Sequence, residues 1–76
     1  MRYNDKAWES TDKRFGLAFF KSAQPKSTAF EDAPPMFHND INVLRQEAQK
    51  LIAAGRYKYI ELWALWEEDG RLVETF

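Results

Sequence analysis

The stretch Tyr57–Trp66, YKYIELWALW, runs directly into residues 67–76, EEDGRLVETF, and the two together decide the fold. The first stretch is the most apolar run in the chain and is rich in aromatic and branched residues, which favour β-strands. The Asp69-Gly70 pair that follows is a hairpin signal. The sequence therefore predicts a C-terminal hairpin over residues 57–76.

The two faces of the predicted strand differ, because side chains alternate along a strand. One face carries Ile60, Leu62, Ala64 and Trp66 and is wholly apolar, so we expect it to pack on a helix. The other face carries Tyr57, Tyr59, Glu61, Trp63, Leu65 and Glu67. This second face is unusual because its large aromatic groups need a cover of their own.

Two turns fit the hairpin. A two-residue loop at Asp69-Gly70 pairs Glu68 with Arg71, whereas a three-residue loop with Gly70 as a bulge pairs Glu67 with Arg71. We favour the bulge, because it places Trp66 beside Leu72 on the core face. The same register puts Phe76 and Glu74 on the core side, with Val73 and Thr75 behind.

The clearest helix is predicted over residues 39–54. Its apolar residues recur at the helical period and are Ile41, Leu44, Ala48, Leu51 and Ile52. Asn39 or Asp40 can cap its start, and Gly55 stands where a left-handed residue ends a helix. This helix is the element expected to cover the apolar face of the sheet.

A second strand is predicted over residues 14–21, RFGLAFFK. Both of its faces are apolar and one is built partly of small residues, which favours a central strand with something packed closely over Gly16 and Ala18. Residues 22–38 form a long loop that holds all three prolines. Residues 1–13 are polar and are expected to be a tail or an edge strand.

The predicted fold class is α+β, in one domain over residues 1–76. One helix packs on a small antiparallel or mixed sheet of three to four strands in the order (β)βαββ. A chain this short buries only about 60% of its unfolded surface, so its stability depends on aromatic packing or self-association. The aromatic content of 16% is high, and there is no cysteine to form a disulfide.

If one helix covers one face of the sheet, the aromatic face is open unless something else covers it. Three covers are possible: a homodimer, a different protein, or the chain itself, with Tyr3, Trp8 and Phe30 as plugs. An exposed aromatic face indicates an interaction site. The predicted partner-binding residues are Tyr57, Tyr59, Glu61, Trp63, Leu65, Glu67 and Arg71.

Single-stranded nucleic acid is the alternative ligand for this face, because bases stack on exposed aromatic rings. The net charge of −1 and the acidic hairpin residues argue against it. No enzyme is expected, because the sequence has no phosphate loop, nucleophile elbow or metal-ligand spacing. A catalytic role for His38 is disfavoured, since it is expected at a helix N-terminus. No cofactor, metal or small-molecule substrate is predicted.

No apolar run approaches the length of a membrane span, and the N-terminus lacks the hydrophobic core of a signal peptide, so the cytoplasm is the expected location. In size, composition and small α+β sheet, the chain is similar to the short accessory proteins of phages and mobile elements that bind and block a host protein. This likeness rests on no motif. The expected function is that of a small regulator or inhibitor that binds another protein or a second copy of itself.

Overall fold

The computed structural model of the chain describes residues 6–23, 31–66 and 70–76. Its elements are α1 (Ala7–Ser10), β1 (Phe15–Phe20), β2 (Met36–His38), α2 (Ile41–Ala53), β3 (Tyr59–Ala64) and β4 (Arg71–Thr75). The strands form one sheet in the order β2-β1-β3-β4, and every neighbouring pair is antiparallel. The fold is therefore α+β, with one main helix on a small sheet, as predicted.

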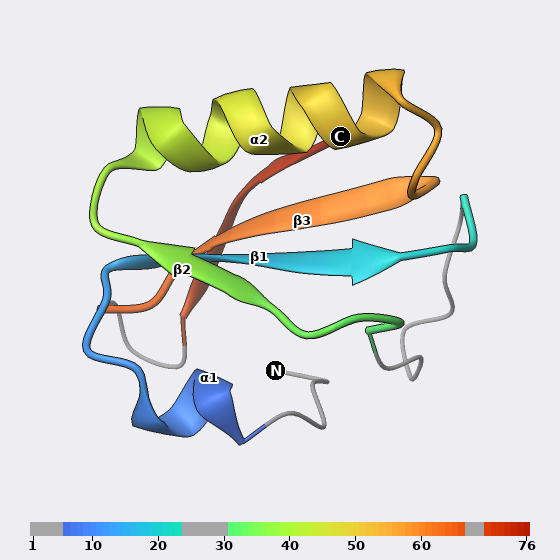
Figure 1. Cartoon of the computed structure of the whole chain (residues 1–76). Helices are drawn as coiled ribbons and strands as arrows, with labels where there is room; N and C mark the ends of the chain where they lie inside the picture. The colour runs from blue at the N-terminus through green and yellow to red at the C-terminus, as the bar shows by residue number, and fades with distance from the viewer. Residues whose placement is uncertain (1–5, 24–30, 67–69) are drawn as a thin grey trace.

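The sheet has a cover on each face. The long helix α2 lies across one face, which we call the helix-side face, and the short helix α1 lies below the other, which we call the outer face (Figure 1). Strands β2 and β3 are both antiparallel to β1, which lies between them, so they run in the same direction. Helix α2 joins them and crosses over β1, which makes a split β-α-β unit.

Helix α2 begins and ends with the signals that the sequence contains. The Asp40 side chain accepts a hydrogen bond from the backbone N–H of Asn42, at 2.9 Å, and so caps the first turn. At the other end Gly55 has φ of 71°, and its N–H donates to the carbonyl of Ile52. The N–H of Arg56 donates to the carbonyl of Leu51, so the helix closes in a Schellman motif.

The helix-side face holds the larger hydrophobic core. Its buried residues come from α2 and from the two central strands, and they are Leu17, Phe19, Leu44, Ala48, Ile60 and Leu62. The prediction that the even-numbered residues of β3 face the helix is confirmed by Ile60 and Leu62. The prediction of a central strand at residues 14–21 is also confirmed, because β1 pairs on both sides.

The fourth strand does not come from the N-terminus. Residues 36–38, predicted as part of a loop, form the edge strand β2 and pair with residues 15–17 of β1. Residues 7–10, for which a tail or an edge strand is predicted, form the single helical turn α1. The predicted edge strand is wrong because Trp8 is buried against the sheet face, where it cannot pair along an edge.

Both predicted hairpin registers are wrong. Arg71 pairs with Ala64, and Leu72 pairs with Trp63. A bulge then leaves Val73 as an extra residue in β4, and the pairing resumes between Glu74 and Leu62. Because the bulge shifts the alternation by one residue, Leu72 points to the outer face and is 42% exposed, instead of entering the core.

The same bulge places Val73 against the helix-side core, so the prediction that it lies behind is wrong. Phe76 also packs on this core, as predicted. Glu74 is on the helix side, as predicted, and its carboxylate accepts a hydrogen bond from Nε of Arg45 in α2 at 2.8 Å. Thr75 lies on the outer face, also as predicted, and it pairs there with Glu61. The ion pair with Arg45 of α2 therefore compensates for the position of the Glu74 carboxylate on the core side of the sheet.

Candidate interaction site

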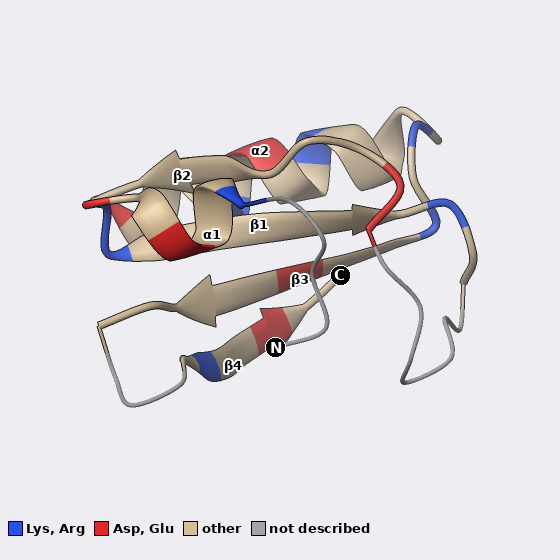
Figure 2. Cartoon of the chain, turned by 90° about the horizontal axis from the view of Figure 1, so that it is seen from below, with Lys and Arg blue, Asp and Glu red and all other residues tan. Residues whose placement is uncertain are grey.

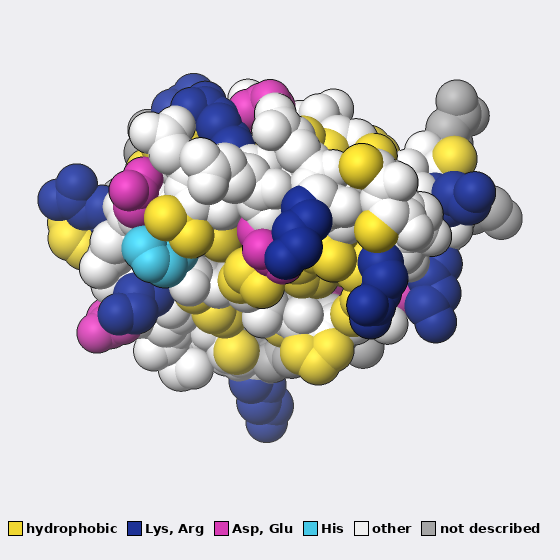
Figure 3. Space-filling model, turned by 45° about the horizontal axis from the view of Figure 1, so that its top comes forward, with side chains coloured by type: hydrophobic (Ala, Val, Ile, Leu, Met, Phe, Trp, Pro, Cys, Tyr) yellow, Lys and Arg dark blue, Asp and Glu magenta, His cyan; other side chains and the backbone are white. Residues whose placement is uncertain are grey.

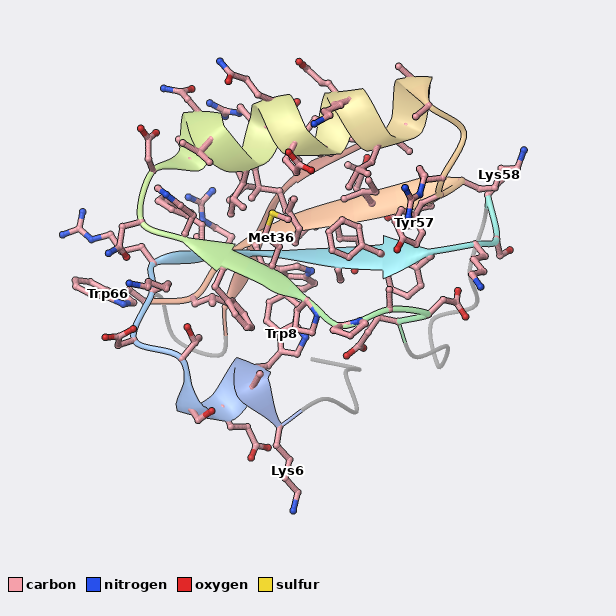
Figure 4. All side chains as sticks on the ribbon, in the orientation of Figure 1. Lys6, Trp8, Met36, Tyr57, Lys58 and Trp66 are labelled. Atoms are coloured by element: carbon pink, nitrogen blue, oxygen red, sulfur yellow. The ribbon has the colours of Figure 1, made fainter. Side chains whose placement is uncertain are left out.

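One half of the outer face is covered by the chain itself. Trp8, from α1, is 6% exposed and forms a cluster with Ala18 and Phe20, against which the partly buried Phe37, Tyr59, Trp63 and Leu65 pack. Figure 2 shows α1 in front of the half of the sheet made by β1 and β2, and Figure 4 shows Trp8 between α1 and the sheet. Of the three covers considered from the sequence, the structure therefore has the chain itself for this half of the face.

The fit of Trp8 depends on Gly16. A Cβ built on Gly16 would lie 2.5 Å from Cζ3 of Trp8 and 2.9 Å from Cδ1 of Phe37, closer than such atoms approach. The rings of Trp8 and Phe37 themselves meet edge to face, with centroids 4.9 Å apart. The small face of β1 is thus filled by an indole, as its composition predicts, while the plugs proposed at Tyr3 and Phe30 lie outside the described residues.

A carboxylate is buried in the middle of this face. Glu61 is 3% exposed and pairs across the sheet with Ala18 and Thr75. Its two oxygens accept hydrogen bonds from neighbours on the same strand: the hydroxyl of Tyr59 at 3.1 Å and Nε1 of Trp63 at 3.2 Å. Glu61 therefore binds the polar groups of the aromatic side chains beside it, and it is buried within the outer face instead of being exposed to a partner.

We expect Glu61→Leu to destabilise the protein by about 1–3 kcal/mol, because it removes the acceptor of two hydrogen bonds, from the Tyr59 hydroxyl and from Nε1 of Trp63. Chemical denaturation followed by tryptophan fluorescence measures the change. The matched control is Glu74→Leu, which breaks a half-exposed ion pair worth at most about 1 kcal/mol. If Glu61→Leu were neutral or stabilising, the desolvation of the carboxylate would cost as much as its hydrogen bonds return.

The predicted partner-binding residues separate in the structure. Tyr59, Glu61, Trp63 and Leu65 do share the outer face. Tyr57 lies on the helix side, where its ring is 4.9 Å from that of Phe19, because β3 begins only at Tyr59 and the alternation does not extend back to residue 57. Arg71 pairs with Ala64, away from the outer aromatic groups, and Glu67 lies outside the described residues.

The most exposed aromatic side chain in the described part of the chain is Trp66, which was not among the predicted partner-binding residues. It is 67% exposed, whereas every other aromatic residue within 6–23, 31–66 and 70–76 is buried or half-buried. In Figure 4 it projects from one end of the sheet, at the opposite end from Tyr57 and Lys58. The prediction that Trp66 joins the core beside Leu72 is wrong, because β3 ends at Ala64 and the chain leaves the sheet before residue 66.

Trp66 forms a small site with its neighbours. The guanidinium carbon of Arg14 lies 4.5 Å from the centroid of the Trp66 ring, a cation–π contact. Beside this pair is a hollow of about 360 Å³, and its lining residues are Arg14, Phe15, Ala64, Trp66 and Arg71. Phe15, Ala64 and Arg71 are cross-strand neighbours in one row of the sheet, so they form its floor and one wall. We call this the Trp66 site.

The backbone at the Trp66 site is held from two directions. The N–H of Arg14 donates to Oδ1 of Asn39 at 2.9 Å, and the N–H of Leu65 donates to the carbonyl of Arg14 at 2.7 Å. The first bond ties the start of β1 to the entry of α2, and the second extends the β1–β3 pairing beyond its last residues. The sequence contains these residues but no spacing that joins them, since Asn39 follows Arg14 by 25 residues and Leu65 follows it by 51.

His38 has a structural contact. Its Nδ1 accepts a hydrogen bond from the backbone N–H of Asp40 at 2.9 Å, so it supports the start of α2.

No group of three or more possible metal ligands occurs among the described residues. No helix in the described part of the chain is long and apolar enough to cross a membrane. No protein-family model matches the chain, and no curated protein or solved structure matches it.

Proposed function

We propose that this chain is a small non-enzymatic protein-binding module that regulates or inhibits its partner, and that its main contact is the Trp66 site. The observation that carries the proposal is the 67% exposure of Trp66, in a chain whose other described aromatic side chains are buried or half-buried. Tryptophan is enriched among the residues that dominate interface energies. The partner is another protein or a second copy of this chain.

Two further features support a protein partner. The Trp66 ring and the Arg14 guanidinium contact each other, which restrains both side chains and lowers the side-chain freedom that is lost on binding. Charged side chains of both signs are scattered over the face that Figure 3 shows, without a continuous basic patch. A surface of this kind suits a protein partner better than the phosphate backbone of a nucleic acid.

We predict that Trp66→Ala weakens partner binding by about 30-fold or more, the effect of a hot-spot residue. The unfolding free energy should change by no more than about 0.5 kcal/mol, because the side chain is exposed. The test is capture from host lysate by tagged wild type and Trp66→Ala, with and without nuclease, followed by affinity measurement on the recovered protein. Val43→Ala, another exposed apolar residue, on α2, is the matched control.

Each outcome of this experiment is informative. A partner protein supports the proposal if it is captured in the presence of nuclease by the wild type and by Val43→Ala, and is not captured by Trp66→Ala. Concentration-dependent dimers in sedimentation, lost with the same variant, identify a second copy as the partner. Binding that disappears with nuclease, or that falls steeply with salt, favours single-stranded nucleic acid instead. Capture unaffected by Trp66→Ala contradicts the proposal.

A further inference from the structure

We infer that the Trp66 site takes a carboxylate: an aspartate or glutamate side chain, flanked by apolar residues, in a segment of the partner protein. The inference rests on the proposed function and adds the chemistry of what is bound. Its recognition element is the guanidinium of Arg14, with the Trp66 ring and the floor of the hollow as the apolar surround.

The Arg14 side chain is available to a ligand. Arg14 is exposed, and its guanidinium makes the contact with Trp66 but no hydrogen bond or ion pair with another described residue. A guanidinium has five N–H donors in a rigid fork that matches the two oxygens of a carboxylate. An arginine held against an aromatic ring keeps those donors for an acceptor while its position is restrained.

The hollow has the size and lining for a short acidic segment. At about 360 Å³ it is at the lower end of the range for ligand pockets, which is room for one or two side chains. Phe15 and Ala64 make an apolar floor, and the exposed ring of Trp66 makes a wall. The methylene groups of a glutamate and an adjoining aliphatic residue would contact these surfaces, while the carboxylate reaches Arg14.

The charges around the site favour a single carboxylate over a polyanion. Glu67, Glu68 and Asp69 follow Trp66 directly in the sequence, and Asp12 is two residues from Arg14. A strand of repeating phosphates would bring several negative charges near these acidic residues, whereas a carboxylate between apolar neighbours brings one, so the repulsion is smaller for the carboxylate.

The test is a titration of ¹⁵N-labelled full-length protein followed by NMR. The direct reporters are the Trp66 indole N–H and the Arg14 Nε–H signals. The probes are the capped peptide acetyl-Gly-Leu-Glu-Leu-Gly-amide, the same peptide with glutamine for glutamate, and the single-stranded octanucleotide dT8. The variants are Arg14→Gln and Arg14→Lys, with Arg56→Gln as the control for the loss of one exposed positive charge.

We expect the glutamate peptide to shift both reporters and to bind about 5-fold more tightly than the glutamine peptide, as for a good exposed ion pair. Arg14→Gln should remove most of this preference, with Arg71 still lining the hollow, Arg14→Lys should remove less of it, and Arg56→Gln should leave it unchanged. Equal binding of the two peptides, no shift with the glutamate peptide at millimolar concentration, or stronger shifts with dT8 would each overturn the inference. If Trp66→Ala still abolishes partner capture in any of those cases, the proposed function stands without it.

Discussion

Replacing Trp8 by alanine should lower the free energy of unfolding by about 3–5 kcal/mol, the usual cost of removing a buried aromatic side chain. Trp8 is 6% exposed and is the one residue of α1 that is buried on the outer face. Small domains have little stability to lose. Trp8→Ala is therefore expected to leave the chain marginally folded or unfolded at room temperature.

Thermal and chemical denaturation measure this effect, and Trp66→Ala is the control of the same chemistry. Both substitutions remove an indole, but Trp66 is 67% exposed, so its loss should change stability by no more than about 0.5 kcal/mol. Each kcal/mol is expected to lower Tm by about 4–8 °C in a domain of this size. A change below about 1 kcal/mol for Trp8→Ala would mean that α1 is a detachable cover and that the outer face is readily uncovered.

Gly16→Ala is the second large effect that we expect, at about 1–3 kcal/mol of destabilisation from overpacking. The added methyl group would lie 2.5 Å from Cζ3 and 2.8 Å from Cη2 of Trp8, so the indole must move. The two closest contacts are with Trp8 and a third, at 2.9 Å, is with Phe37, so shortening the Trp8 side chain should relieve most of the clash. The cost of Gly16→Ala should therefore be smaller in a Trp8→Leu background, with a coupling of about 0.5–3 kcal/mol.

Gly55→Ala provides the control for this double-mutant cycle. It is the same chemical change, but nothing lies within 4 Å of the added Cβ, and the cost comes from the positive φ of 71°. That cost, about 1–2 kcal/mol, should add to the effect of Trp8→Leu without coupling. Additive behaviour at Gly16 as well would show that Trp8 does not pack over β1.

The elements that the sequence determined are those set by interactions between near neighbours. The start and end of α2 follow from Asp40 and Gly55, whose side chain and backbone act within one turn of the helix. The central position of β1 follows from its two apolar faces, and the close packing over it follows from Gly16. These features depend on periodicity and on backbone chemistry, so they can be predicted without knowing what lies across the sheet.

The tertiary structure alone decided which residues meet across the fold. The bulge at Val73 moves Leu72 to the outer face, β3 stops two residues before Trp66, and Trp8 covers Gly16 from another segment. The candidate site changed with them, from an open aromatic face to the Trp66 site. The strand register, the strand ends and the residues that cover the sheet depend on how segments remote in sequence pack against one another. The alternative packings differ little in local β-propensity, so no single stretch of the sequence shows which of them is more stable.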